Sequence, residues 1–210
     1  MPTYSNISTF HDTPFSEYLK WPEYSHSGLK YGNKPMDGAV SSNIIFGGIV
    51  DAIQAGTVSN EQYGSIYYPF ALKHAKKIDE KFGWAMEYMS KQLSLKGRAE
   101  HNGFVLPVKV RPDMVLGNKF LLENKITFSG CTNKKAPEHQ KIASLISIID
   151  FMGYDNQVYH QKEMSGVEDA YILMHSVPLG ETYLFKRLTT QAEIEKAADW
   201  WNNKISLYGL

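Results

Sequence analysis

Residues 42–55, SNIIFGGIVDAIQA, carry apolar side chains at helical spacing, so we predict an α-helix here. Gly47 and Gly48 stand one turn before Asp51, on the face of that carboxylate. Because glycine has no side chain, this face leaves room for a close approach to Asp51. The apolar positions of the helix are Ile45, Phe46, Ile49, Val50, Ala52 and Ile53.

Further helical segments are predicted by spacing and end signals. Residues 69–96 read as a helix that is broken near Gly83 and ended by Gly97. Pro137 fits the first turn of a later helix. The apolar positions of that later helix are Ile142, Leu145, Ile146 and Ile149.

Two more helices are indicated by capping residues towards the C-terminal end of the sequence. Asp155 could cap a helix that continues through Gln157. Thr190 and Glu193 form a capping box, which predicts a last helix running to about Tyr208.

Between the helices the period of the pattern changes from helical to alternating. FVLPVKVRPDMVL (104–116) predicts a strand, GN (117–118) a tight turn, and KFLLENKIT (119–127) the returning strand. AYILMHSV (170–177) and TYLFKRL (182–188), separated by PLGE, predict another strand pair.

The order of elements predicts an α/β or α+β fold with a mixed sheet flanked by helices. Residues 1–40 are rich in Pro, Ser, Tyr and Gly and are expected to be irregular, with a short helix beginning near Ser27. A length of 210 residues without an internal repeat fits one domain with a substantial core. We expect residues 99–188 to hold the core strands and helix of that domain.

Composition narrows the classes of function. Hydrophobic residues make up 43% and charged residues 21%, as in ordinary globular proteins. No apolar run is long enough to span a bilayer, and the first residues lack a signal pattern, so we expect a cytoplasmic protein. The single Cys131 excludes an internal disulfide and any multi-cysteine zinc or iron–sulfur site.

Charge does not indicate a global attraction to nucleic acid, because 22 basic and 22 acidic residues give a net charge of zero. Basic residues do cluster locally, as around Lys73, His74 and Lys77. Such a cluster is either a solvated helix face or a surface that neutralises DNA phosphates without regard to sequence.

The predicted hairpin carries the candidate chemistry. Asp113 lies four residues before the GN turn and Glu123 five after it, so the two carboxylates are near-opposite. Side chains of a strand alternate between faces, so Glu123 and Lys125 point the same way. Two carboxylates and an ammonium group can therefore converge on this hairpin.

Two readings of these residues remain open. Carboxylates held close together repel unless a cation lies between them, and Mg²⁺ prefers oxygen ligands. Two such ions can clamp a phosphodiester for in-line attack, with a neighbouring lysine positioning the water. On spacing alone, Glu123 and Lys125 could equally form an ordinary surface ion pair on a hairpin.

The hairpin resembles the active-site hairpin of the PD-(D/E)XK nuclease superfamily, with Pro112-Asp113 followed by Glu123-Asn124-Lys125. Other segments resemble RecE-type and lambda-exonuclease-like phage exodeoxyribonucleases, in the same order over residues 18–177. YLKWPEYSHSGLK resembles their Ser-x-Ser-x-Leu-Lys segment, VKVRPDMV their Arg-Pro-Asp strand, and LLENKIT their Asp-x-Lys-Thr-Thr strand.

Two helices of the resemblance depart from the pattern of these exonucleases. IIFGGIVDAI resembles their Gly-Thr-Ala-x-His helix, with Gly47 at the glycine and Asp51 at the histidine. MGYDNQVYHQ resembles their Tyr-x-x-Gln-x-x-x-Tyr helix through Tyr154 and Gln157, but Gln161 stands at the final tyrosine. A carboxylate at position 51 is a competent ligand for Mg²⁺.

The resemblance implies roles for individual residues. Asp113 would bridge the metal ions, with Glu123 and the backbone carbonyl of Asn124 completing the ligands and Asp51 adding a carboxylate. Lys125 would position the attacking water. The remaining candidates are Gln157 to orient the site or contact DNA, Glu100 as an upstream acidic residue, and Lys73, His74, Lys77 and Tyr154 as DNA contacts. Simpler interpretations stay open for Gln157 as a buried or capping amide, Asp51 as a surface or capping residue, and Glu100 as an exposed hairpin residue.

The function that the resemblance implies is a metal-dependent exonuclease using Mg²⁺ or Mn²⁺, with two ions per site. It would hydrolyse DNA from duplex ends in the 5′→3′ direction, as a ring-shaped homo-oligomer in phage or prophage recombination. Its partners would be duplex DNA ends and a single-strand-annealing recombination protein, with no membrane. The alternatives are an endonuclease on the same fold, a DNA-binding relative without catalysis, and an unrelated domain whose hairpin binds no metal.

Overall fold

In the part of the chain that the computed structural model describes, residues 1–11, 13–31, 42–86, 90–91 and 93–210, the strands form two sheets. The three-stranded sheet is antiparallel and has the order β1-β3-β4. The five-stranded sheet has the order β2-β5-β6-β7-β8, with β6 and β7 parallel and the other neighbours antiparallel. The strands are β1 (Thr3–Phe10), β2 (Ser90–Lys91), β3 (Ser94–His101), β4 (Phe104–Val110), β5 (Met114–Leu116), β6 (Phe120–Thr127), β7 (Asp169–Ser176) and β8 (Glu181–Arg187).

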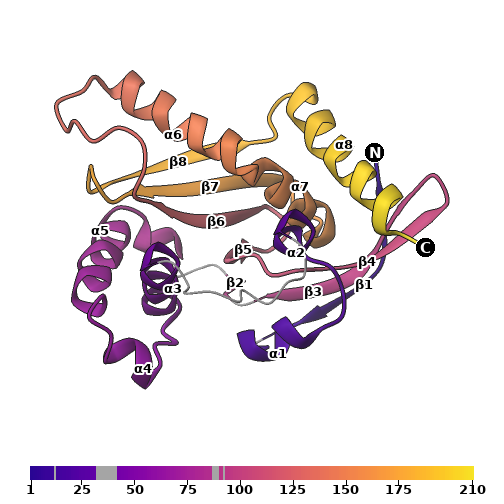
Figure 1. The fold of residues 1–210 in the computed structure, drawn as a ribbon, viewed down its shortest axis with the longest axis horizontal. Coiled ribbons are helices and arrows are strands. Elements are labelled where there is room, and N and C mark those ends of the chain that lie inside the picture. Colours follow the sequence, from indigo (N-terminus) through magenta and orange to yellow (C-terminus); the bar gives the residue numbers. More distant parts are fainter. Residues whose placement is uncertain (12, 32–41, 87–89, 92) are drawn as a thin grey trace.

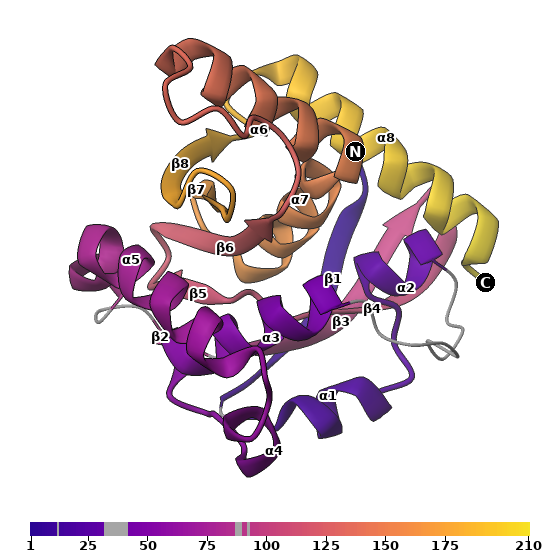
Figure 2. The ribbon, with the colours of Figure 1, turned by 60° about the vertical axis from the view of Figure 1, so that its left-hand side comes forward.

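Helices cover both faces of the five-stranded sheet (Figure 1). α6, α7 and α8 lie on one side, and α3 and α5 lie on the other, as the turned view of Figure 2 also shows. α6 and α7 form the crossover that the parallel strands β6 and β7 require. The helices are α1 (Phe15–Lys20), α2 (His26–Tyr31), α3 (Ser42–Ala55), α4 (Asn60–Tyr63), α5 (Tyr68–Met86), α6 (Glu138–Met152), α7 (Tyr154–Ser165) and α8 (Gln191–Tyr208).

The alternation of side chains along β6 divides the core into two apolar clusters. Leu121 packs with Ile149 and Trp201 in the cluster beneath α6, α7 and α8. Leu122 packs with Ile49 and Ala75 in the cluster beneath α3 and α5. By the same alternation, Glu123 and Lys125 face α7, whereas Asn124 faces α3.

The chain passes from one sheet to the other at residues 111–113. β4 ends at Val110 and β5 begins at Met114, so the predicted single strand over 104–116 is interrupted. Pro112 explains the break, because it has no N–H to donate to a strand ladder. Asp113 therefore stands at the junction of the two sheets, immediately before β5.

Most predicted elements are confirmed, with shifted ends. These include the helix over 42–55, the hairpin of β5 and β6, the pair β7 and β8, and the helix after Pro137. Thr190 and Glu193 form the predicted capping box of α8. The α/β class with a mixed sheet flanked by helices is thus confirmed. The assignment of residues 1–210 to one domain with its core in 99–188 stays a prediction.

Three predictions about local structure are wrong. Residues 3–10 and 15–20 of the expected irregular segment form β1 and α1, while residues 32–41 lie outside the described part. The helix over 69–96 runs through Gly83 but ends at Met86, and the strand β3 begins at Ser94. The pairing of β3 with both β1 and β4 explains why residues 94–96 form a strand and do not continue the predicted helix.

The third correction concerns the start of α7. Gly153 occupies its N-cap in the left-handed conformation, with φ 65°, and no side chain caps the helix. Asp155 lies in the first turn and its carboxylate accepts from Arg187 at 2.8 and 2.6 Å.

Among the described residues, no helix has the length and apolar character to cross a membrane.

A buried histidine pair joins α5 to the five-stranded sheet. The Nδ1 atom of His74 lies 2.6 Å from Nε2 of His175, whose Nδ1 lies 2.8 Å from Oγ1 of Thr182. Burial, with smaller contributions from His74 and Lys77, lowers the pKa of His175 to about 4. Burial also lowers the pKa of His74, with Lys77 and Lys73 acting in the same direction. Both rings are therefore neutral at pH 7.

This pair should make the free energy of unfolding depend on pH. Below about pH 6.5 the histidines of the unfolded chain bind protons, whereas the folded pair does not. The contribution of the pair to the free energy of unfolding is therefore fully present above about pH 6.5 and is lost as the pH falls towards 4. We expect His74→Asn, whose amide still faces His175, to reduce the slope in this window by up to about 1.4 kcal/mol per pH unit. Urea unfolding of both proteins between pH 7.5 and 4.5 measures the difference.

Some carboxylates affect the pH dependence of the free energy of unfolding in the opposite direction, and their contribution cancels when the two proteins are compared. Asp51 and Asp113 have raised pKa values, so they favour folding at low pH equally in both. Equal slopes for His74→Asn and the unsubstituted protein would show that His74 titrates normally in the folded state.

Candidate active site

The hairpin register places Asp113 and Glu123 opposite each other. Met114 pairs with Leu122, and one step further along the antiparallel ladder Asp113 meets Glu123. The backbone N–H of Asp113 donates to Oε1 of Glu123 at 3.2 Å. In return, the backbone N–H of Asn124 donates to Oδ2 of Asp113 at 2.8 Å. The convergence predicted from the turn and the strand spacing is therefore present.

The Glu123 carboxylate is buried and accepts from four donors. Oε2 accepts from Nζ of Lys125 at 2.6 Å and from Nε2 of Gln157 at 2.8 Å. Oε1 accepts from Nε2 of Gln161 at 2.6 Å, in addition to the Asp113 N–H. An ionised carboxylate offers about four lone-pair positions, so the two oxygens are fully engaged. The Glu123 side chain is 1% exposed and the Lys125 side chain 17%, which excludes the interpretation as an exposed surface ion pair.

On the opposite face of β6, Asn124 reaches α3. Its Nδ2 donates to Oδ1 of Asp51 at 3.1 Å and to Oε1 of Gln54 at 2.5 Å. No described atom lies within 4 Å of the positions that a Cβ would occupy at Gly47 and Gly48. The open glycine face predicted beside Asp51 is thus found in the fold.

The electrostatics of the site are those of crowded carboxylates. Loss of hydration raises the pKa of Asp113 well above its ordinary value, and Glu123 and Asp51 raise it further against the opposing effect of Lys125. Loss of hydration also raises the pKa of Asp51 to about 6, with a smaller contribution from Glu123. Asp51 as a residue is exposed to solvent, so the loss of hydration concerns only the end of its side chain that faces Asn124.

Lys125 is held in its charged form. Burial alone would lower its pKa, but the carboxylates of Glu123 and Asp113 outweigh burial and hold the pKa above the ordinary value for lysine. Its Nζ also lies 5.4 Å from the ring centroid of Tyr154. In this state Lys125 is a donor and a positive charge, not a base.

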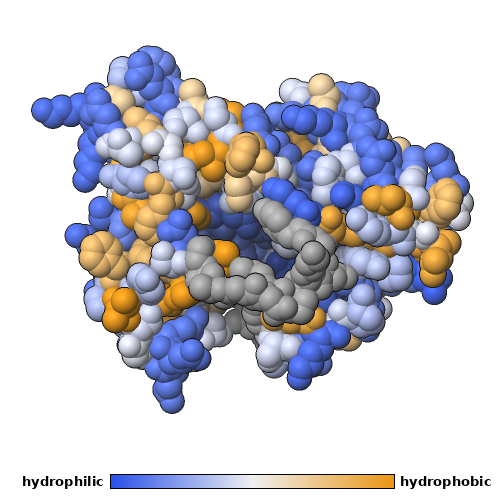
Figure 3. Space-filling view, viewed as in Figure 1, coloured by the Kyte–Doolittle hydropathy of each residue, from blue (hydrophilic) through white to orange (hydrophobic). Residues whose placement is uncertain are grey.

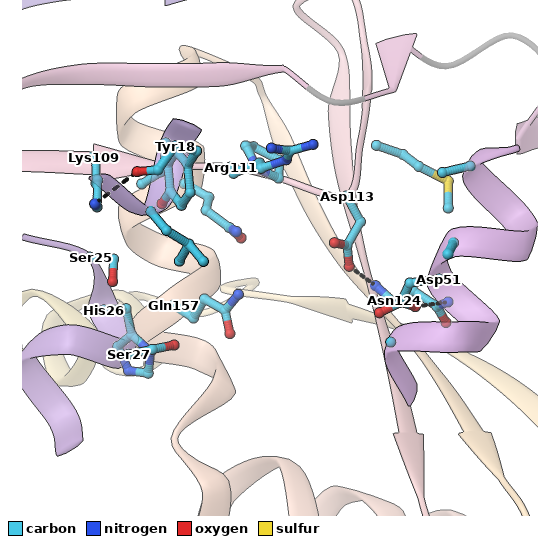
Figure 4. Close-up of a pocket in the computed structure, with 18 of the residues that line it drawn as sticks. Tyr18, Ser25, His26, Ser27, Asp51, Lys109, Arg111, Asp113, Asn124 and Gln157 are labelled. Atoms are coloured by element: carbon cyan, nitrogen blue, oxygen red, sulfur yellow. Dashed lines mark hydrogen bonds between the residues drawn. The ribbon is translucent and has the colours of Figure 1, made fainter. Parts of the chain in front are cut away.

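Asp51 and Asp113 line a cavity of about 540 Å³, whereas Glu123 and Lys125 lie behind its wall and are not among its lining residues. The surface is hollowed between α3 and α2, and the walls visible there are hydrophilic (Figure 3). Asp51, Asp113 and Asn124 lie together at one end, and Ser25, His26 and Ser27 lie at the other, with Gln157 between them (Figure 4).

Two cations at the wall of the cavity are tied to the N-terminal segment. Nζ of Lys109 donates to the carbonyls of Tyr18 at 3.0 Å and Trp21 at 2.7 Å. The guanidinium of Arg111 donates to the carbonyl of Thr13 at 2.9 Å. These bonds hold the segment around α1 against β4, so it forms one wall of the cavity.

The residues present fit a hard divalent cation. Asp51, Asp113 and Glu123 provide carboxylate oxygens, and Oδ1 of Asn124 is buried without a hydrogen-bond partner in the described structure. In a strand, the N–H and C=O of a residue face the same neighbour, so the Asn124 carbonyl faces the same edge as Asp113. Oxygen ligands of this kind suit Mg²⁺ or Mn²⁺.

Within the described residues, no three His, Cys, Asp or Glu side chains are already grouped as a set of metal ligands. Lys125 and the two glutamines donate hydrogen bonds to the Glu123 carboxylate that a cation would bind, and of these donors Lys125 carries the balancing charge. A cation would have to take the place of at least one of these donors.

Several predicted site residues lie elsewhere. Glu100 is on β3, outside the cavity, where Oγ of Ser5 donates to its carboxylate at 2.9 Å. His74 is buried against His175, so the prediction that it faces DNA is wrong. Lys77 donates to the carbonyl of Gly180 at 3.4 Å. Lys73 is exposed on α5 and does not line the cavity, so the structure does not bring the α5 cluster to the site.

Two residues of the site were not given a role by the sequence. Gln161, noted only as a departure from a tyrosine, binds Glu123, and Gln54 binds Asn124. A signal for Gln161 was present, because residues four apart on a helix share a face and Gln157 is four residues before it. No comparable local pattern pointed to Gln54.

Comparison with known proteins shows similarity in structure alone. No family model and no curated protein matches the sequence. A crystal structure of a candidate exonuclease from Eubacterium rectale has 15% identity and a TM-score of 0.56, over 86% of this chain and 70% of that one. The crystal structure of SSO0001 is more distant, with 12% identity and a TM-score of 0.38 over 93% of this chain and 87% of that one. The structure of Scheffersomyces stipitis Rai1 has 10% identity and a TM-score of 0.35, over 75% of this chain and 47% of that one. The first of these similarities shows that this chain shares the fold of that protein, a mixed sheet flanked by helices.

Proposed function

We propose that this protein is a metal-dependent nuclease that hydrolyses phosphodiester bonds of DNA. The observation that carries the proposal is the opposition of Asp113 and Glu123 across the hairpin, with Lys125 2.6 Å from Glu123. The fold shared with a candidate exonuclease supports the same assignment. Burial of this much opposed charge is costly to folding and is typical of a functional site.

The metal ligands in this proposal are oxygen atoms on both faces of β6. Asp113, Glu123 and the backbone carbonyl of Asn124 hold Mg²⁺ or Mn²⁺, and Asp51 adds a carboxylate from α3. Two such ions would polarise the phosphoryl oxygens and supply a bound water of lowered pKa. The raised pKa values of Asp113 and Asp51 support this assignment, because a cation would offset the loss of hydration and the smaller repulsion from Glu123 that raise them.

The other groups of the site would orient the reactants. Lys125 remains protonated and so positions the attacking water and the scissile phosphate by donating hydrogen bonds. Gln157 lines the cavity and would contact the DNA there, and Tyr154 lies beside the Lys125 ammonium group. Lys73 and Lys77 remain candidates for contact with DNA phosphates away from the cavity.

The finer form of the proposal follows the resemblance to RecE-type enzymes. The protein would digest duplex DNA from its ends in the 5′→3′ direction, as a ring-shaped homo-oligomer in the host cytoplasm. It would act in phage or prophage recombination beside a single-strand-annealing protein.

Linear and closed-circular duplex DNA distinguish the candidate activities. We expect the protein to degrade the linear form in Mg²⁺ and to leave the closed circle intact. With a chelator present, it should cleave neither form. The products are followed on agarose gels over time, with a nicked circle as a third substrate.

Each contrary outcome has a defined meaning. Cutting of the closed circle would identify an endonuclease on the same fold. Retarded migration of DNA in a gel, without cleavage in either metal, would identify a DNA-binding relative that lacks catalysis. Cleavage that persists in chelator would contradict the assignment of the carboxylates as metal ligands.

A further inference from the structure

Helix α7 holds both oxygens of Glu123 through two glutamines one turn apart. Gln157 and Gln161 are four residues apart and share a helix face, which points at β6. Gln157 donates to Oε2 of Glu123 at 2.8 Å, and Gln161 donates to Oε1 at 2.6 Å. Neither oxygen of the carboxylate can rotate freely while both amides are in place.

The two amides differ in their surroundings. Gln161 is 3% exposed, and it shares Oε1 with a backbone donor, the N–H of Asp113. Gln157 is half-buried at the middle of the cavity wall, and it shares Oε2 with the flexible side chain of Lys125. Of the two amides, the one on Oε1 is therefore the more deeply buried, and the one on Oε2 is the more exposed.

The second amide atom of Gln161 also has a place in the cavity. Its Oε1 is buried and has no hydrogen-bond partner among the described residues, although Gln161 lines the cavity. A buried amide oxygen without a partner costs free energy unless a water or ligand donates to it. A water bound to a divalent cation coordinates it through oxygen, so its O–H groups point away from the ion and can donate to such an acceptor.

We propose that Gln161 is a positioning residue that fixes Glu123 for a divalent cation, and that Gln157 competes with the cation for the same carboxylate. This inference rests on the proposed function. Glu123 already has about four acceptor positions filled, so one donor must leave before a metal can bind. Gln157 is the donor that leaves, because it is the more exposed of the two amides, while Gln161 and the Asp113 N–H keep the carboxylate in its orientation.

The inference predicts opposite effects for two matched substitutions. Methionine has the length of glutamine but no amide, so it fills the same volume without a donor. We expect Gln161→Met to weaken Mn²⁺ binding by about tenfold or more, as does the loss of other groups that orient metal ligands. Gln157→Met should bind Mn²⁺ as tightly as the unsubstituted protein or a few-fold more tightly. Calorimetric titration of the full chain with Mn²⁺ measures both affinities.

Thermal unfolding in chelator controls for the fold, and DNA cleavage is assayed separately. Gln161→Met that binds Mn²⁺ as well as the unsubstituted protein would overturn the inference, as would an equal loss in both variants. Failure of the unsubstituted protein to bind Mn²⁺ would also overturn it. If Gln161→Met fails to fold, Gln161→Asn, whose shorter amide cannot reach Glu123, should show the same tenfold loss, and normal affinity there would contradict the role. Absence of cleavage by a protein that shows the expected pattern of Mn²⁺ affinities would contradict the nuclease and leave the positioning role standing.

Discussion

Asp113→Asn is expected to abolish metal-dependent cleavage and at the same time to stabilise the protein in chelator. Loss of a metal-bridging carboxylate removes several kcal/mol of transition-state stabilisation, which corresponds to about a 1,000-fold loss of rate. Asparagine still offers an oxygen to the Asn124 N–H that now donates to Asp113. It carries no charge, so the cost of burying a carboxylate near Glu123 and Asp51 disappears.

The sign of the stability effect follows from the raised pKa of Asp113. A buried acid with a raised pKa destabilises the folded state increasingly as pH rises from its ordinary value through the folded value. We therefore expect the melting temperature of Asp113→Asn in chelator to exceed that of the unsubstituted protein by a few degrees at pH 7.5. The difference should vanish at acidic pH, where Asp113 is protonated.

Asp199→Asn is the matched control, because Asp199 is exposed on α8 and far from the cavity. It should change neither the rate of cleavage nor the dependence of melting temperature on pH. A variant Asp113→Asn that cleaves DNA at the normal rate would remove Asp113 from the metal ligands. Equal melting temperatures at pH 7.5 would show that Asp113 is not destabilised by its surroundings.

Lys125→Met should also remove cleavage, but with the opposite effect on stability. Loss of a group that positions the attacking water reduces rates by about 100-fold to 10,000-fold. The substitution also leaves Glu123 buried without its cation, 2.6 Å from where the ammonium group had been. Breaking a buried ion pair in this way costs roughly 3 kcal/mol.

Mn²⁺ should restore part of the lost stability, because the ion takes over the neutralisation of Glu123. Melting temperatures with and without Mn²⁺ measure this recovery. Lys119→Met is the control on the same hairpin, because Lys119 is exposed in the turn, and it should behave as the unsubstituted protein. Normal stability of Lys125→Met in chelator would mean that the three remaining donors, Gln157, Gln161 and the Asp113 N–H, satisfy the Glu123 carboxylate.

The local part of the candidate site was predictable because short-range geometry determines it. Pro112 precedes the start of β5, and the loop 117–119 pairs Leu116 with Phe120, which places Asp113 opposite Glu123. The two-residue turn predicted at 117–118 would have shifted this register by one residue. Alternation along β6 likewise set Glu123 and Lys125 on one face. The capping box of α8 is equally local, since all its atoms lie within four residues.

The sequence misled where a local pattern had two solutions. Residues 94–96 were placed at the end of the helix predicted over 69–96, but they begin β3 because β1 and β4 supply partners on both sides. His74 belongs to a basic run that favours a surface helix face, yet it is buried because its ring packs against His175 of β7. Partners distant in sequence decided both cases.

The sequence by itself determined the hairpin, its three charged residues and the class of the fold, since each depends on contacts within a few residues or on the order of the elements. Only the tertiary structure decided that Asp51 reaches Asn124 across 73 positions and that Gln161 holds Glu123 across 38. A periodic pattern states which face of a helix is buried, but it does not state which strand that face meets. Packing of α3 and α7 on opposite faces of β6 supplied that information, and with it the completed site.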